Sequence, residues 1–385
     1  MNKVVVVIPT YNEIGNIVGV TSALAKVFKS IRGYNVHILF VDDNSPDGTS
    51  HEITKISQKY LFVHLLKNKH KGGLGHAYKK GFAYAIDKLN ADILFEFDAD
   101  LSHDPEKIPA MLKKIENGSD LVLGSRYILG GGIPKNWGIH RKFLSIIGNK
   151  FIQCVMFNFK IHDWTGGYRA ITKKTVLAVV PELRDKAFEG YSWQTGFLVK
   201  SLQLGYVVSE VPFVFVDRTK GKSKLGPEYM VTNFVYIMNV RMKEILNNRI
   251  FKFLMVGGFG TVVQFIALYL VRRVMSYQLA TFTSIEISVV SNFILSNLWT
   301  FADRKLKAIE VPWKFVQFNI ASSGSIIIQQ GIAFVGEKTI GLHPLFTVPV
   351  IHLGVDTGVM YIVVGILIGM FWNFFAYSRL VWKKK

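Results

Sequence analysis

The chain has 385 residues, of which 50% are hydrophobic, and carries a formal net charge of +19. Its single cysteine, Cys154, excludes an internal disulfide and fits a reducing compartment. The basic residues form no stripe interleaved with stacking aromatic side chains, so we expect no nucleic-acid partner.

The composition changes sharply along the chain. Before about residue 250 the apolar runs are short and interrupted by charge, and after it four long apolar stretches dominate. We expect a soluble domain over 1–230, an interfacial amphipathic helix or linker over 231–249, and an all-α membrane domain over 250–385. The chain opens on a strand pattern without the features of a signal peptide, so we expect the first domain to lie in the cytosol.

Strand and helix patterns alternate in the first domain. Apolar runs typical of buried strands occupy residues 4–8, 37–41 and 61–66. Apolar side chains recur at helical spacing in residues 14–30, 50–60 and 76–89. This alternation predicts an α/β fold with a mostly parallel sheet and right-handed crossovers.

Two carboxylates follow a further apolar run at residues 94–97. Asp98 and Asp100 come directly after this expected strand, at the end where open α/β sheets bind ligands. Two aspartates so close together repel unless they share a cation, and their hard oxygen ligands suit Mg²⁺ or Mn²⁺. The alternative reading is a solvated turn before a helix.

The turns after the other strands carry acidic residues as well. Glu13 and Asp43 would meet the two aspartates at one sheet edge, beside a glycine-rich turn at residues 71–75. This combination predicts a nucleotide site with a metal, in which Asp43 accepts from a base or ribose hydroxyl. No G-x-G-x-x-G follows the first strand and no P-loop motif is present, which argues against a dehydrogenase or a P-loop enzyme.

A series of motifs resembles one enzyme family. The motifs include Asp98-Ala99-Asp100-Leu101-Ser102-His103 and, in chain order, residues 8–13, 41–49, 72–78, 98–105, 124–127, 163–169 and 215–226. In these residues the chain resembles the inverting family-two glycosyltransferases with the GT-A fold, and more narrowly the dolichyl-phosphate mannose synthases.

The resemblance implies transfer of mannose from GDP-mannose to dolichyl or polyprenyl phosphate. A phosphate monoester is largely ionised at neutral pH and needs no general base. Glu189 is the nearest candidate for a base, and a structural or sugar-binding role is its alternative. A UDP-glucose-dependent polyprenyl-phosphate glucosyltransferase and a non-enzymatic lipid transporter or anchor are the alternative functions.

The resemblance also implies roles for individual residues. The expected metal ligands are Asp98, Asp100 and Ser102, where many relatives have glutamine in place of this serine. The expected catalytic residues are Asp100, Arg126, Arg218 and Lys224. The expected nucleotide-sugar-binding residues are Pro9, Tyr11, Glu13, Val41, Asp43, Asp98, Ala99, Asp100, Ser102, Arg126, Arg218 and Lys224. For the acceptor phosphate we expect Arg126, Arg141 and Ser145, because cations must bring two anionic substrates together.

Residues 137–159 carry enough apolar side chains to lie on a bilayer as an interfacial helix. A core helix is the alternative. The basic start of this segment, residues 140–142, favours the membrane.

The second half opens with Phe251-Lys252-Phe253-Leu254-Met255-Val256-Gly257-Gly258, and in these residues it resembles the small four-helix GtrA-like membrane domain. The stretches long enough to span about 30 Å of hydrocarbon are residues 251–271, 279–301, 315–335 and 355–377. The flanking basic residues predict an integral protein of the cell membrane, with the catalytic domain and both termini cytoplasmic. Glu286 and Asp356 lie within the spans, where structural hydrogen bonding competes with a lipid-phosphate or transport role. Pro344 and Pro349 predict a loop or re-entrant piece before the last helix.

Overall fold

The computed structural model describes residues 2–183, 188–190, 192–217, 227–271, 273–275, 277–341, 343–348 and 353–382. The chain divides into two compact units, Met1–Arg241 and Met242–Lys385. Helix α8 (Pro227–Asn247) contains the boundary between them.

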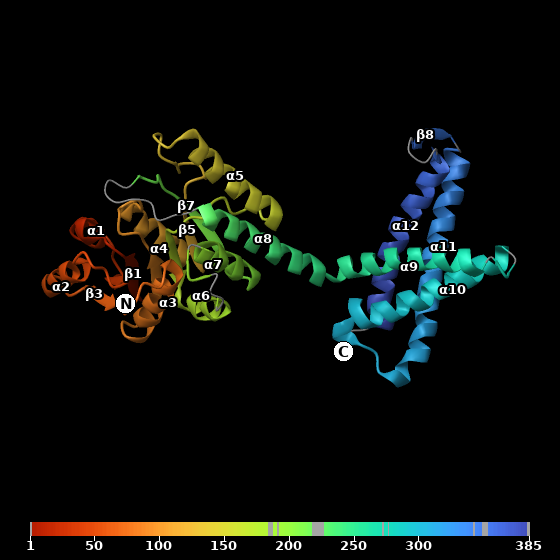
Figure 1. Cartoon of the computed structure of the whole chain (residues 1–385), viewed down its shortest axis with the longest axis horizontal. Coiled ribbons are helices and arrows are strands. Elements are labelled where there is room, and N and C mark those ends of the chain that lie inside the picture. Colours follow the sequence, from red (N-terminus) through yellow and green to blue (C-terminus); the bar gives the residue numbers. More distant parts are fainter. Residues whose placement is uncertain are drawn as a thin grey trace. The chain divides into compact units, whose positions relative to one another are not determined.

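The first unit is built on a seven-stranded sheet with the strand order β3-β2-β1-β4-β6-β5-β7 (Figure 1). Its strands are β1 (Asn2–Thr10), β2 (Tyr34–Asp42), β3 (Val63–Lys67), β4 (Ile93–Glu96), β5 (Leu121–Ser125), β6 (Arg169–Thr172) and β7 (Val208–Pro212). All neighbouring strands pair in parallel except β6, which runs antiparallel to both β4 and β5. The predicted mostly parallel α/β sheet is therefore confirmed.

Helices cover both faces of this sheet. They are α1 (Ile14–Phe28), α2 (Thr49–Lys59), α3 (Leu74–Asp87), α4 (Ile108–Glu116), α5 (Ile139–Met156), α6 (Lys173–Val179) and α7 (Ser192–Gln203). Short 3₁₀ turns at Pro105–Lys107 and Val180–Glu182 precede α4 and follow α6. Side chains of α1, α2 and α4 pack into the core on one face, and those of α3, α6 and α7 into the core on the other.

The unbroken valine run of β1 reflects burial on both faces. Val4 and Val6 belong to the core beneath α1, whereas Val5 and Val7 belong to the core beneath α3. Full burial of such a side chain contributes about 1.5–3 kcal/mol. Helix α3 approaches the sheet so closely that a Cβ at Gly81 would lie 2.6 Å from Val7 Cγ1. The loops that follow these strands thus extend from a sheet that is tightly covered by helices on both faces.

The second unit is mostly helical. Its long helices are α9 (Arg249–Val271), α10 (Tyr277–Leu295), α11 (Val311–Thr339) and α12 (Thr357–Ala376). Single turns at Ala302–Arg304 and Ala308–Glu310 join α10 to α11, and wider π-helical turns occupy Ser296–Thr300 and Tyr377–Val381. Helix α9 packs on α10, and α11 packs on α12. An aromatic cluster stabilises one end of the unit, including the stacked rings of Phe301 and Trp382, whose centroids are 4.5 Å apart.

A short antiparallel strand pair, β8 (Pro344–Val348) and β9 (Leu353–Asp356), lies between α11 and α12. The two prolines led us to expect a loop or re-entrant piece, so this strand pair is a correction. Asp356 ends β9 and lies outside α12, which begins at the next residue. The expected last span, residues 355–377, thus begins two residues before the helix itself.

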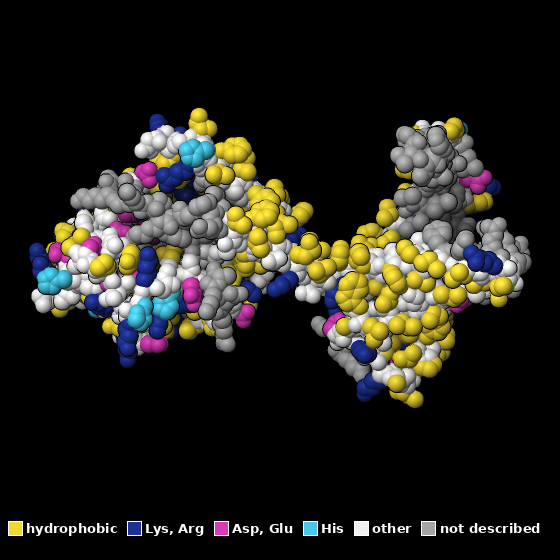
Figure 2. All heavy atoms as spheres, in the orientation of Figure 1, with side chains coloured by type: hydrophobic (Ala, Val, Ile, Leu, Met, Phe, Trp, Pro, Cys, Tyr) yellow, Lys and Arg dark blue, Asp and Glu magenta, His cyan; other side chains and the backbone are white. Residues whose placement is uncertain are grey.

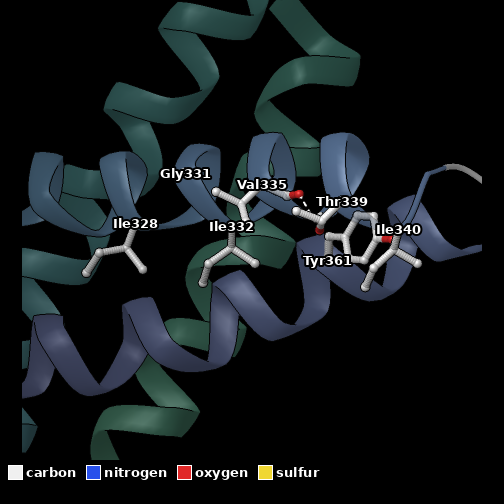
Figure 3. A pocket seen from close by; sticks show the side chains of 8 residues that line it. Ile328, Gly331, Ile332, Val335, Thr339, Ile340 and Tyr361 are labelled. Carbon is white, nitrogen blue, oxygen red and sulfur yellow. Dashed lines mark hydrogen bonds between the residues drawn. The ribbon is translucent and has the colours of Figure 1, made fainter.

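In the part of the chain that is described, no helix combines the length and the apolarity needed to cross a membrane. The four expected spans are thus not confirmed. Helices α11 and α12 enclose an apolar groove with a volume of about 570 Å³ (Figure 3). Ile328, Ile332 and Val335 line it from α11, and Tyr361 closes one end, where its hydroxyl donates to the carbonyl of Gly341 over 3.0 Å.

Candidate active site

Three loops meet at one edge of the sheet because β1, β2 and β4 run parallel. Pro9 and Thr10 of β1 pair with Val41 and Asp42 of β2, and the amide of Phe97, just past β4, donates to the carbonyl of Val7 over 3.2 Å. The predicted donor-site residues that follow these strands therefore lie on a common edge.

Each of these loops contains a residue other than glycine in the left-handed backbone region. The φ angles are +56° at Asn12, +58° at Asn44 and +58° at Leu101. Such a conformation suits asparagine but costs a leucine about 1–2 kcal/mol. Strain of this kind gathers at functional sites, where it fixes the direction of neighbouring side chains.

Asp43 shapes the glycine-rich turn. Its carboxylate is buried and accepts from Asn68 Nδ2 at 2.7 Å and from the amides of Gly72 and Gly73 at 3.0 and 3.3 Å. Gly73 has φ +88°, and a Cβ there would lie 2.6 Å from the carbonyl oxygen of Glu189. The expected acceptance from a nucleotide hydroxyl stays a prediction, and the structure adds a loop-shaping role.

Glu13 and Tyr11 line the loop after β1. The Glu13 amide donates to Thr49 Oγ1 over 3.0 Å, and the Glu13 carboxylate accepts from Asn16 Nδ2 over 2.7 Å. The ammonium group of Lys71 lies 4.1 Å from the centre of the Tyr11 ring. The loop after β1 thus contacts both the loop after β2 and the glycine-rich turn after β3.

The Asp98–Asp100 loop is fixed from within. Asp100 Oδ1 accepts from the amide of Ser102 over 3.1 Å, and the amide of Asp98 donates to Nδ1 of His103 over 3.1 Å. The Asp98 side chain is 44% exposed, so it is accessible to a ligand. Ser102 Oγ is buried and has no hydrogen-bond partner within the described ranges.

These residues fit a divalent metal whose remaining ligands come from the substrate and water. Among the described residues no three His, Cys, Asp or Glu side chains cluster closely enough to hold a metal on their own. Mg²⁺ is, however, commonly held by one or two carboxylates while phosphate and water supply the other ligands. Two aspartates and one unpartnered serine oxygen on a single tight loop match that donor set.

His103 is buried behind this loop. Its ring stacks on Tyr168 with 4.9 Å between centroids and meets the edges of Phe97 and Phe213. Burial lowers the pKa of His103 below its ordinary value, although Asp98 and Asp100 raise it, and Arg126 lowers it further while Asp163 raises it. The imidazole is therefore neutral, and because Nδ1 accepts from Asp98, the proton lies on Nε2. Phe213, which packs against this ring, donates its amide to the carbonyl of Ser125 over 3.1 Å, so the aspartate loop is linked to the segment that carries Arg126.

A second buried group supports the end of β4. Glu96 and Arg169 are both fully buried, with 3.7 Å between Glu96 Oε2 and Arg169 Nε, and Trp193 Nε1 donates to Glu96 Oε1 over 2.7 Å. Burial raises the pKa of Glu96 to about 7, although Arg169 opposes this shift. The group lies two residues before Asp98 and anchors the strand that carries the loop.

Arg126 follows β5 and is clamped by Asp163. Its Nε and Nη2 each donate to the Asp163 carboxylate over 2.7 Å, its amide donates over 3.1 Å, and Nη2 also donates to Thr165 Oγ1 over 2.9 Å. Burial alone would raise the pKa of Asp163, but the Arg126 guanidinium holds it below its usual value. Much of the Arg126 fork is thus engaged within the protein.

Arg141 and Ser145 lie on α5. The Arg141 guanidinium packs 3.8 Å from the centre of the Trp137 ring and lies 3.5 Å from Asp217 Oδ2. Ser145 Oγ hydrogen-bonds the hydroxyl of Tyr127, the residue after Arg126, over 2.5 Å. The three expected acceptor residues are therefore linked through neighbouring segments. Arg218 and Lys224 lie outside the described residues.

Helix α5 exposes a broad apolar face. Ile139, Phe143, Ile146 and Ile147 are all exposed on it, and the rings of Phe151 on α5 and Phe234 on α8 stack at 5.0 Å. Figure 2 shows hydrophobic side chains gathered over this part of the first unit. The helix is thus not a fully buried core helix.

Comparison with known proteins identifies the family. Residues 5–177 match the family described as Glycosyl transferase family 2, and residues 252–382 match the one described as GtrA/DPMS, transmembrane domain. Over 368 residues the chain is 31% identical to the dolichol-phosphate mannosyltransferase of Pyrococcus furiosus, covering 94% of this chain and 97% of that relative. The chain belongs to the dolichol-phosphate mannosyltransferase family.

Two bacterial relatives of this family resemble the first unit. The undecaprenyl-phosphate mannosyltransferase of Micrococcus luteus is 36% identical over 58% of this chain and 88% of its own. The polyprenol monophosphomannose synthase of Mycolicibacterium smegmatis is 34% identical over 58% of this chain and 81% of its own. The resemblance seen in the motifs is confirmed, and the expectation of a glycosyltransferase is confirmed over the non-enzymatic alternative.

For this member of the dolichol-phosphate mannosyltransferase family, sequence reasoning missed the buried partners. His103, Asp163 and Arg169 all lie in motifs that carry the resemblance, yet no role was assigned to them. Asp163 is 37 residues from Arg126 in the chain, and Arg169 is opposite Glu96 in the antiparallel β4–β6 pair. A charged residue inside an otherwise apolar strand was the one signal available, and Glu96 gave it.

Proposed function

We propose that the protein transfers mannose from GDP-mannose to dolichyl or polyprenyl phosphate with inversion, giving dolichyl-phosphate mannose and GDP. The observation that carries this proposal is the link between the Asp98–Asp100 loop and the Arg126 segment: His103 accepts from the Asp98 amide, and Phe213, which packs on its ring, donates to the carbonyl of Ser125. It gives one site a region for a metal-bound diphosphate and a region for a second anion. The names of the relatives support mannose as the sugar and a polyprenyl phosphate as the acceptor.

The donor side comprises the loops after β1, β2 and β4. Asp98, Asp100 and Ser102 would hold Mg²⁺ or Mn²⁺, which neutralises charge on the leaving diphosphate. His103 keeps the loop in place through the Asp98 amide, and Asp43 holds the glycine-rich turn beside it. The other donor contacts that we propose are from Pro9, Tyr11, Glu13, Val41 and Ala99.

The acceptor side comprises Arg126, Arg141 and Ser145. Arginine binds phosphate oxygens in a bidentate manner, which favours a fixed orientation of the incoming nucleophile. The proposed roles of Arg218 and Lys224, which would close on the leaving diphosphate, rest on the motif alone. We propose no general base, and Glu189 contributes its carbonyl oxygen to the amides of Gly75 and His76.

The step is an in-line displacement. An oxygen of the acceptor phosphate forms a bond to the anomeric carbon of mannose while the bond from that carbon to the diphosphate oxygen breaks. The electron pair leaves with GDP, and the configuration at the anomeric carbon inverts. Because both reactants are anions, the cationic side chains must offset their repulsion, which is the main catalytic demand.

The acceptor also requires contact with a membrane. The exposed apolar faces of α5 and α8 support an interfacial position for the catalytic unit, with Val231 and Phe234 exposed on α8. We propose that residues 231–249 link it to an integral domain over 250–385, built from α9 to α12, as the matched family description suggests. Both termini and the catalytic unit would face the cytoplasm.

The test uses the full-length protein in detergent or nanodiscs. It is incubated with polyprenyl phosphate, Mg²⁺ or Mn²⁺, and either radiolabelled GDP-mannose or radiolabelled UDP-glucose. We expect a labelled mannolipid whose glycosidic configuration is inverted, and loss of the product on chelation of the metal. Faster transfer from UDP-glucose would overturn the donor, and retained configuration would overturn the displacement.

A further inference from the structure

Asn149 connects the acceptor helix to the loop that orients Arg126. It lies on α5 and is only 3% exposed. Its Oδ1 accepts from the amide of Trp164 over 2.7 Å, and its Nδ2 donates to the carbonyl of Ser145 over 2.8 Å and to Thr165 Oγ1 over 3.4 Å. A buried side-chain amide whose polar atoms are all hydrogen-bonded to two segments fixes the distance between those segments.

Thr165 carries the connection to the guanidinium. Its Oγ1 accepts from Arg126 Nη2 at 2.9 Å as well as from Asn149. The carboxylate of Glu210 fixes the start of the same loop by accepting from the amides of His162 and Asp163. Asp163 holds Arg126 by its charge, and Thr165 adds a contact that links the guanidinium to α5.

The contact between Thr165 and Asn149 affects the spacing of the expected acceptor residues, because two of these residues also lie on α5. The helix carries Ser145 one turn and Arg141 two turns before Asn149. A shift of α5 relative to Thr165 would therefore change the spacing between Arg126 and the other acceptor residues. Misplacement of about 1 Å can lower a rate about 100-fold.

We propose that Asn149 and Thr165 are positioning residues for the acceptor phosphate, which set the orientation of Arg126 relative to Arg141 and Ser145. This inference rests on the proposed function, because it assumes that these three residues bind one phosphate. It assigns no contact between Asn149 or Thr165 and a substrate. Their effect is carried by Arg126.

Gln153 supplies a matched control. It is a second buried amide on α5, one turn beyond Asn149, and its Nε2 donates to the carbonyl of Ile161 over 2.5 Å. Its side chain thus holds the same loop, and within the described residues it makes no hydrogen bond to Thr165 or Arg126. The Ile161 carbonyl also accepts from Trp164 Nε1 over 3.1 Å, so it keeps a partner when Gln153 is replaced.

The experiment compares Thr165→Val, Thr165→Ser and Gln153→Leu in the full-length protein. Valine keeps the shape of threonine but removes the hydroxyl, and serine keeps the hydroxyl. For Thr165→Val we expect the KM for polyprenyl phosphate to rise about tenfold with the KM for GDP-mannose unchanged, as expected for one lost hydrogen bond to a charged group. Thr165→Ser should restore the acceptor KM, and Gln153→Leu should lower thermal stability without changing the ratio of the two KM values.

The inference is overturned if Thr165→Val leaves the acceptor KM unchanged, or if Gln153→Leu reproduces the same rise. Asn149→Ala provides a second measurement, since it should weaken the acceptor more than the donor in any fraction that folds. An equal rise in both KM values for Asn149→Ala would also contradict the inference. Failure of the wild-type protein to transfer mannose would overturn the proposed function instead, so the two failures are distinguishable.

Discussion

Replacing Arg126 and Asp163 singly and together separates stability from activity. The Asp163 side chain is fully buried and that of Arg126 is 11% exposed, with two contacts of 2.7 Å between guanidinium and carboxylate. Removing one partner leaves an uncompensated charge in a buried site, which costs about 3–5 kcal/mol. We therefore expect Arg126→Met and Asp163→Leu each to destabilise the first unit by that amount.

The double variant should cost much less than the sum. An apolar pair of similar volume removes both charges, and such replacements of buried ion pairs are often neutral or stabilising by about 1–4 kcal/mol. Part of that gain is lost here, because the Arg126 amide and Thr165 Oγ1 lose a partner at 3.1 and 2.9 Å. We expect a coupling free energy of at least about 3 kcal/mol between the two substitutions.

Transfer activity should not return with stability. If Arg126 binds the acceptor phosphate, the double variant folds but makes no mannolipid at acceptor concentrations that saturate the wild type. Hydrogen exchange of amides in residues 121–126 and 161–169 measures the local stability, which suits a protein with two units better than one unfolding midpoint. Recovery of both stability and transfer would refute the role of Arg126, and a single-substitution cost below about 1 kcal/mol would refute a desolvated pair.

Three further expectations follow from other parts of the first unit. Asp100→Asn should weaken Mn²⁺ binding in the presence of GDP about tenfold or more, measured by calorimetry, because one anionic ligand is lost. Leu101→Gly removes about 1–2 kcal/mol of left-handed backbone strain, so thermal stability should hold or rise while Mn²⁺ affinity falls through loosening of the loop. Burial, His64 and Lys3 lower the pKa of His37 from 6.5 to about 4, so its contribution to stability is present above about pH 6.5 and is lost towards pH 4. His37→Asn should therefore show a smaller drop in melting temperature between pH 7 and pH 4, and an unchanged drop would contradict this assignment.

The sheet could be predicted where the sequence of a strand alone shows that the strand is buried. Residues 4–8 are apolar without interruption because both faces of β1 are covered, and the polar residues that follow mark the edge of the sheet. The short strand β6 gave no such signal. It has four residues, begins with Arg169 and is antiparallel to its neighbours, so its place depends on contacts that no local pattern encodes.

The candidate site likewise has one part that the sequence predicted and one part that it did not. Asp98 and Asp100 are two residues apart in the sequence and need only one strand end to bring them together. Pairing of Arg126 with Asp163, or of Glu96 with Arg169, joins segments that are distant in the chain. The charges alone did not reveal these pairs, because an isolated arginine in the sequence does not disclose which carboxylate neutralises it. Burial in the folded structure determines these pairings, because a desolvated charge requires a partner of opposite charge.

The two buried ion pairs lie on opposite sides of the charge distribution in the candidate active site, one near the aspartates and one containing Arg126. Glu96 is held by Arg169 beneath the anionic Asp98 loop, and Asp163 is held by Arg126 on the cationic side. His103 is neutral and accepts from the Asp98 amide behind this loop. A charged imidazole there would bind the carboxylates more tightly and compete with a metal for Asp98. Keeping this ring neutral by burial would therefore leave the aspartates to the proposed metal, and Arg126 is the cation that we propose for the second anion.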